Sequence, residues 1–109
     1  MTVLTEQEFR MKSDTALESA RRALLALSDS EGFEVELQNG VLNLVFEEPS
    51  ETKFVVSPNA PVRQIWVSAM ARSYKLAWSP DLSAFALDGE TLPQLLERLA
   101  RRFLRATGD

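Results

Sequence analysis

Cysteine and histidine, the two residue types that most often bind metals or do chemistry at neutral pH, are both absent from this 109-residue chain. Without cysteine the chain offers no disulfide, no thiolate nucleophile and no sulfur ligand for zinc or a metal cluster. Without histidine it lacks the usual general base near pH 7 and the usual nitrogen ligand of metals. Any metal bound by this chain is therefore expected at oxygen ligands, which suit magnesium, calcium, manganese or iron.

Long apolar runs are also lacking, since no stretch approaches the ~18 residues needed to span a bilayer. The first ten residues include Glu6 and Glu8 and so differ from basic, acid-poor signal and transit peptides. We therefore expect a cytoplasmic protein that does not enter a membrane. A chain that is 45% hydrophobic and 26% charged is typical of one globular domain, which we expect to span residues 1–109.

Charge is unevenly distributed along the chain. Residues 1–51 carry a net charge of −7 and residues 52–109 a net charge of +3, which together give the overall −4. Such a bipolar surface suits a charged protein partner. It suits nucleic acid poorly, because the basic side chains lie mainly on one short predicted helix without interleaved aromatic residues.

The clearest structural signal is Asn39-Gly40, which lies between two β-prone runs. An Asn-Gly pair supplies the two positive φ angles of a type I′ turn, so the pattern predicts a two-residue hairpin. In that register one face carries only apolar side chains, namely Phe33, Val35, Leu37, Leu42, Leu44 and Phe46. The other face carries Glu34, Glu36, Gln38 and Asn43, as expected of a half-buried antiparallel pair.

A helix is predicted before this hairpin. Thr5 and Glu8 have the spacing of a capping box, so the helix is expected to begin near Thr5. It is expected to end near Ser28, where a short acidic loop over residues 28–32 leads into the hairpin. Its buried stripe is predicted to consist of Phe9, Ala16, Leu17, Ala20, Leu24 and Leu27.

Further strands are predicted after the hairpin, at residues 53–57, 64–68, 74–78 and 84–86. Pro58 and Pro61 are expected to bracket a turn, because neither can donate to a ladder. Asp88-Gly89 is expected to end the sheet. Alternation in the strand at 64–68 places Trp66 opposite its apolar neighbours, on the face that also carries Gln64 and Ser68. A tryptophan among polar neighbours favours an interface residue over a core residue.

A second helix is predicted after the sheet. Thr91 is a natural N-cap, Gln94 follows three residues later, and Pro93 falls in the first turn. Its apolar stripe is predicted to be Leu92, Leu95, Leu96, Leu99 and Phe103. The order of helix, five or six antiparallel strands and helix predicts an α+β sandwich, with both terminal helices packed on one face of the sheet.

This order and several short motifs resemble the frataxin family, in particular its bacterial CyaY-type members. The motifs are Glu8-Phe9, Asp14-Thr15-Ala16-Leu17, Gly40-Val41-Leu42, Gln64-Ile65-Trp66-Val67-Ser68, and Asp88-Gly89-Glu90-Thr91-Leu92 with Leu95-Leu96. They occur in the family's order and cover nearly the whole chain. Gln64-Ile65-Trp66 is the most specific of them.

The resemblance implies an iron-binding accessory protein, not an enzyme, that assists iron–sulfur cluster assembly by docking on the cysteine desulfurase and the scaffold protein. In the family two surfaces matter, an acidic ridge along the first helix and strand, and the open sheet face. Carried over by position, the ridge would bind Fe(II) or Fe(III) weakly through Asp14, Glu18, Asp29, Glu31, Glu34 and Glu36. The open face would contact the partner through Gln64, Trp66 and Ser68. We expect a monomer, or an oligomer that forms with iron.

The chain also departs from the family pattern within the ridge. Arg21, Arg22, Leu25 and Ala26 stand where family members place further acids. Two cations there would repel a metal ion and pair with Glu18 instead. Two alternatives therefore stay open, an iron-independent regulator of the desulfurase and a ferroxidase. The acids can also be solvated surface charges, since no spacing resembles an EF-hand.

Overall fold

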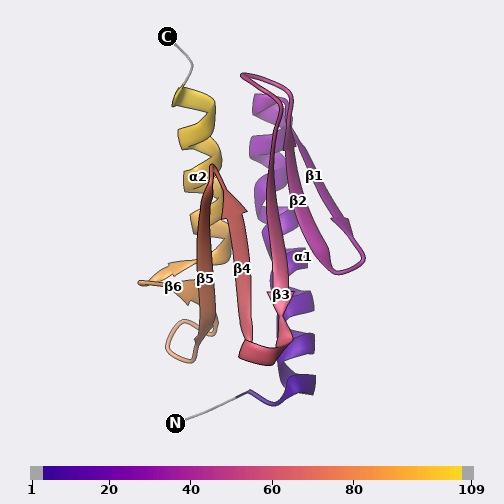
Figure 1. Ribbon diagram of the computed structural model, residues 1–109, viewed down its shortest axis with the longest axis vertical. Coiled ribbons are helices and arrows are strands. Elements are labelled where there is room, and N and C mark those ends of the chain that lie inside the picture. The colour runs from indigo at the N-terminus through magenta and orange to yellow at the C-terminus, as the bar shows by residue number, and fades with distance from the viewer. Residues whose placement is uncertain (1–3, 107–109) are drawn as a thin grey trace.

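The computed structural model describes residues 4–106, which form two helices and a seven-stranded antiparallel sheet (Figure 1). In chain order the elements are α1 (Glu6–Glu31), β1 (Glu34–Gln38), β2 (Val41–Phe46), β3 (Thr52–Asn59), β4 (Gln64–Ala69), β5 (Arg72–Ser79), β6 (Ala84–Leu87), β7 (Glu90–Thr91) and α2 (Leu92–Ala106). A 3₁₀ turn, η1 (Ala60–Val62), joins β3 to β4. The strands lie in the sheet in chain order, so each connection is a short hairpin.

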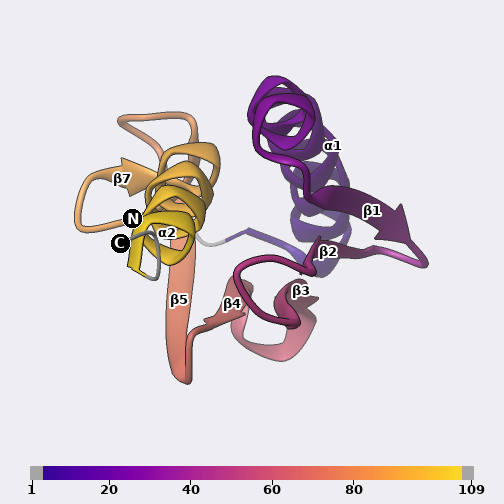
Figure 2. The same cartoon turned by 90° about the horizontal axis from the view of Figure 1, so that it is seen from above.

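Both helices cover the same face of the sheet and leave the other face open, as Figure 2 shows from above. The α+β sandwich predicted from the sequence is therefore confirmed, with seven strands in place of five or six. None of the helices within residues 4–106 is long and apolar enough to cross a membrane.

The hairpin of β1 and β2 has the predicted turn and register. Asn39 and Gly40 have φ angles of 52° and 75°, and Gln38 pairs with Val41 directly across the turn. Farther along, Val35 lies opposite Leu44, and Leu37 lies opposite Leu42, so these apolar side chains point to the helices. The opposite face of β1 carries Glu34, Glu36 and Gln38, all exposed.

Helix α1 begins where the sequence predicts but ends later. The Thr5 side chain accepts a hydrogen bond from the Glu8 N–H at 3.1 Å, and the Glu8 carboxylate accepts from the Thr5 N–H at 2.9 Å. The predicted loop over residues 28–32 is wrong, because the helix continues to Glu31 and is capped by Gly32 at a φ of 83°. Ser28 stays buried in the helix, and its hydroxyl donates to the carbonyl of Phe33.

Two strand boundaries also differ from the prediction. Pro58 does not bracket a turn but lies inside β3, where it pairs with Ile65 of β4. It is tolerated there because β2 does not reach that far along β3, so no strand needs its missing N–H. Asp88-Gly89 does not end the sheet, since φ angles of 53° and 83° turn the chain into the two-residue strand β7.

The core lies between the sheet and the two helices. The predicted stripes of both helices are buried, with Ala16 of α1 only partly so. Phe46 of β2 is the centre of an aromatic cluster, with ring centroids 4.7 Å from Phe33, 4.9 Å from Phe54 and 4.8 Å from Phe103. This cluster fixes the end of α2 against β2 and β3, so the open face rests on a rigid support.

Candidate functional site

Trp66 lies half-buried near the middle of the open face, as the alternation predicted. Its Nε1 donates a hydrogen bond to Oε1 of Gln64 at 2.9 Å. The Nζ atom of Lys75, the cross-strand partner on β5, lies 4.8 Å from the centre of the indole ring. Such a cation–π contact and the hydrogen bond together hold the ring in one orientation before any partner binds.

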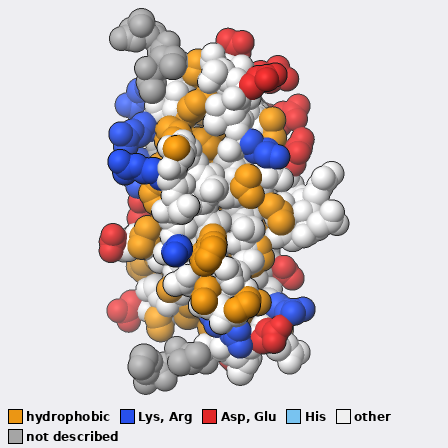
Figure 3. All heavy atoms as spheres, in the orientation of Figure 1, with side chains coloured by type: hydrophobic (Ala, Val, Ile, Leu, Met, Phe, Trp, Pro, Cys, Tyr) orange, Lys and Arg blue, Asp and Glu red, His pale blue; other side chains and the backbone are white. Residues whose placement is uncertain are grey.

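The surroundings of Trp66 mix apolar and polar side chains. Ser68 is exposed beside it, and Ser57 is its cross-strand partner on β3. Other open-face residues include Val41, Asn43, Val45, Val55, Ser73 and Ala77. Figure 3 shows this face, where hydrophobic side chains are scattered among polar ones across the middle. A central tryptophan with a mixed surround has the composition of a protein-binding surface.

Lys75 is a neighbour of Trp66 on this face that the sequence did not predict. The hairpin of β4 and β5 turns at Met70 and Ala71, which are both at positive φ without being glycine or asparagine. Because that turn carries no sequence signal, the register that places Lys75 opposite Trp66 could not be counted from it. The cation lies over one face of the indole.

The six predicted metal ligands are spread over two elements and do not converge. Within residues 4–106 no three acidic side chains are grouped closely enough to hold one metal ion. Asp14 and Asp29 are both exposed on α1 and are separated by about 22 Å along the helix axis, from its rise per residue. Asp29 and Glu31 are two residues apart on the last helical turn, so they point in different directions.

Glu34 and Glu36 are the two predicted ligands on β1. They alternate onto the same open face of β1, which is the edge strand of the sheet. Both are exposed, and neither forms an ion pair with a described residue. In Figure 3 acidic side chains gather along this rim, whereas basic side chains gather on the opposite side over α2.

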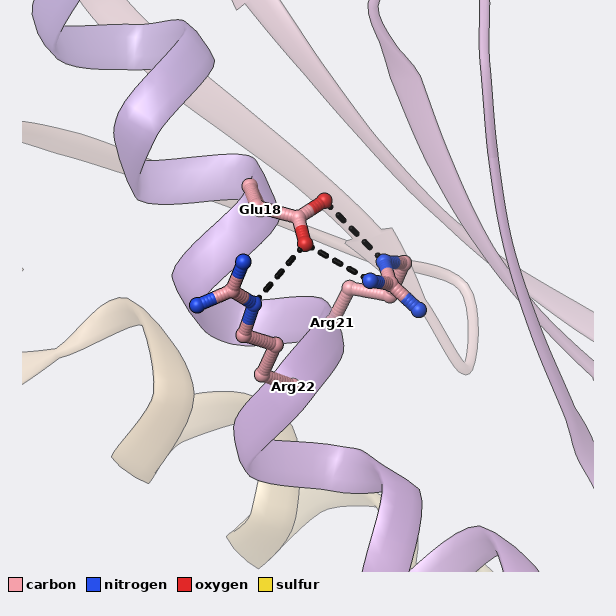
Figure 4. A network of polar contacts seen from close by, with 3 residues as sticks. All are labelled: Glu18, Arg21 and Arg22. Atoms are coloured by element: carbon pink, nitrogen blue, oxygen red, sulfur yellow. Dashed lines mark hydrogen bonds and ion pairs between the residues drawn. The ribbon is translucent and has the colours of Figure 1, made fainter.

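Glu18 is held by two arginines, as the sequence predicts (Figure 4). Arg21 donates to both carboxylate oxygens at 3.0 and 2.6 Å, and Arg22 donates to one of them at 3.0 Å. These hydrogen bonds, that of Arg21 above all, lower the pKa of Glu18 from 4.5 to about 2. Glu18 could therefore bind a metal ion only by giving up these guanidinium partners.

Comparison with known proteins agrees with this architecture. The family model for the frataxin-like domain matches residues 2–106. The iron-sulfur cluster assembly protein CyaY of Cupriavidus metallidurans is 33% identical over 76 residues, which cover 68% of this chain and 67% of that protein. The protein of the same name from Pseudomonas fluorescens is 29% identical over 110 residues, which cover 97% and 94%.

A solved structure also shares the fold. The frataxin from Psychromonas ingrahamii superimposes with a TM-score of 0.64 over 97% of this chain and 94% of that chain, at 14% sequence identity. The sequence and structural similarities extend over almost the whole length of the described residues. The chain therefore belongs to the frataxin-like family, in its bacterial CyaY-type branch.

Proposed function

We propose that this protein is an accessory factor of iron–sulfur cluster assembly that acts by docking on the assembly machinery through the face around Trp66. The observation that carries the proposal is the indole itself, half-buried and held by Gln64 and Lys75 on a sheet face that neither helix covers. Its CyaY-type relatives are named as iron–sulfur cluster assembly proteins, which supports the same process here.

The partner we propose is the complex of cysteine desulfurase and scaffold protein, in the cytoplasm. A held aromatic side chain loses little conformational entropy on binding, so Trp66 suits the centre of such an interface. The acidic rim along β1 would steer the protein toward a basic surface on that complex. In this role the protein changes the rate of the desulfurase and performs no bond chemistry of its own.

Iron binding is a second proposed property, confined to a weak site. Glu34 and Glu36 offer two exposed carboxylates on one strand face, free of ion pairs with residues 4–106. Two carboxylates leave most of the coordination sphere to water, so the ion would exchange readily. Iron is then cargo or effector rather than a resident cofactor. No observation favours the ferroxidase alternative.

Replacing the indole tests the docking proposal. We expect Trp66→Ala to weaken binding to the desulfurase–scaffold complex by about tenfold, as truncation of an interface hot spot does. Leu82→Ala is a matched control, because Leu82 is a large exposed hydrophobic residue in the turn between β5 and β6. Affinity is measured by calorimetry after both variants are shown to unfold at the wild-type temperature. Unchanged affinity of Trp66→Ala would remove the residue from the interface.

A further inference from the structure

A hollow of about 470 Å³ lies on the helical side of the sheet, away from Trp66. It forms where the first half of α1 passes the start of α2 and the strands β5 and β6, which are brought together from distant parts of the chain. Its lining is mainly apolar and includes Met11, Trp78, Phe85 and Leu92. Both its volume and its lining are typical of sites that bind small molecules.

The apolar wall of this hollow is fixed by aromatic packing. Trp78 is half-buried and meets Phe85 edge-on, with ring centroids 5.3 Å apart. Phe85 in turn meets Phe9 of α1 edge-on at 5.6 Å, and both phenylalanines are almost fully buried. A ligand would therefore meet a preformed indole surface rather than a mobile side chain.

Among residues 4–106, Lys12 is the only charged side chain that lines the hollow. Its Nζ atom lies 4.4 Å from the centre of the Trp78 ring, so the cation is held against the indole that lines the hollow. Lys12 forms no ion pair with a carboxylate among residues 4–106. The hydroxyl groups of Thr15, Ser19 and Thr91 add hydrogen-bond donors to the lining. An apolar wall beside one unneutralised cation is complementary to an amphipathic anion.

We propose that this hollow binds a small organic anion with an apolar body, an aromatic or short alkyl carboxylate or sulfonate. The apolar body would lie on Trp78 and Leu92, and the anionic group would face Lys12 and the neighbouring hydroxyl groups. The site lies across the sheet from Trp66, so occupation of the hollow and docking through the open face are separate events.

A matched pair of fluorescent probes tests the proposal on the full chain. 1-Anilinonaphthalene-8-sulfonate carries the required anion, whereas N-phenyl-1-naphthylamine has the same rings without it. We expect the sulfonate to bind at least about fivefold more tightly than the neutral amine, because only the sulfonate can pair with Lys12. The far-ultraviolet circular dichroism and unfolding temperature of each variant are measured first, since a loosened core also binds such dyes.

Three variants separate this site from general binding of the dye. Lys12→Gln should weaken sulfonate binding by about fivefold and leave binding of the neutral amine unchanged. Ser19→Leu, at an exposed helical position on the rim, should fill the hollow and weaken both probes. Lys53→Gln is the control, because it removes the same charge from the exposed face of β3, away from the hollow.

Several results would overturn the proposal. Equal effects of Lys12→Gln and Lys53→Gln would mean that the dye responds only to net charge. Equal affinity for the two probes would make the hollow a site for neutral apolar molecules. In a third outcome, the affinity for the sulfonate falls as the protein concentration rises, and sedimentation shows dimers that Ser19→Leu abolishes. This outcome would mean that a second copy of the chain fills the hollow.

Discussion

At the scale of single residues, Glu18 shows how a predicted ligand can be neutralised by its own helix. Residues three and four positions apart lie on the same helical face, so Arg21 and Arg22 both reach its carboxylate. This pairing follows from spacing and could be predicted from the sequence. The contact between Lys75 and Trp66 could not be predicted, because it depends on the register of the β4–β5 hairpin, whose turn residues are not typical of a hairpin turn.

The lowered pKa of Glu18 predicts how its contribution to stability depends on pH. A carboxylate with a folded-state pKa of about 2 and an ordinary value of 4.5 stabilises the fold above pH 4.5 and loses that effect as the pH falls toward 2. Glu18→Gln should therefore lower the urea midpoint near neutral pH, and the difference from wild type should shrink between about pH 4.5 and 2.

The control for this experiment is Glu47→Gln, which removes an exposed carboxylate that forms no ion pair within the described residues. Its urea midpoint should follow that of the wild type throughout. A difference between Glu18→Gln and wild type that persists undiminished at pH 2 would show that the arginine pairs are not its cause.

At the scale of elements, local turn and cap chemistry decided what could be predicted. Asn39-Gly40 predicts the hairpin of β1 and β2, and the capping box of Thr5 and Glu8 predicts the start of α1. The end of α1 was misplaced because serine and acidic residues resemble a loop, although the residue that stops the helix is Gly32. Strand β7 cannot be predicted with the same certainty, because Asp-Gly ends a sheet as readily as it turns a hairpin, and only two residues follow it before α2.

The turn between β4 and β5 is strained, which predicts a stabilising substitution. Ala71 has a φ of 64°, a conformation that disfavours side chains with a Cβ atom. Ala71→Gly should therefore raise the free energy of unfolding by about 0.5–1 kcal/mol, after the entropy cost of glycine is included. Urea titration measures the change. Ala77→Gly, in the ordinary strand conformation of β5, should destabilise instead, and stabilisation by both would contradict the explanation.

The proposed iron site lies on the edge strand β1 and can be tested by removing its two carboxylates. Replacing both Glu34 and Glu36 with Gln should abolish paramagnetic broadening in an anaerobic Fe(II) titration followed by amide NMR. The control replaces Glu47 and Glu48, two adjacent exposed acids in the loop between β2 and β3, with Gln. This control variant should still show the paramagnetic broadening. Broadening that survives in the β1 variant would place the iron elsewhere, and sharp signals in the wild type would exclude weak iron binding altogether.

At the scale of the whole molecule, the placement of both helices on one side of the sheet decides which surfaces can act. Strand alternation was enough to predict that Trp66, Gln64 and Ser68 share the uncovered face. The distances between the acids of the ridge were harder to predict. The 26-residue length of α1 places Asp14 and Asp29 in opposite halves of the helix, although both belong to the same acidic half of the sequence. The hollow beside Lys12 could not be predicted, since it exists only where residues 11–19 of α1 meet residues 78–93, which are far away in the sequence.

In the function that we propose, the open face, and not the helical side, meets the assembly machinery. The most direct test is amide NMR of the isotope-labelled chain with the unlabelled desulfurase–scaffold complex. We expect the strongest losses of signal on residues 53–57, 64–68 and 73–77, which surround Trp66 on β3, β4 and β5. Strongest losses along α2 or residues 11–19 of α1, with the central strands unaffected, would contradict it.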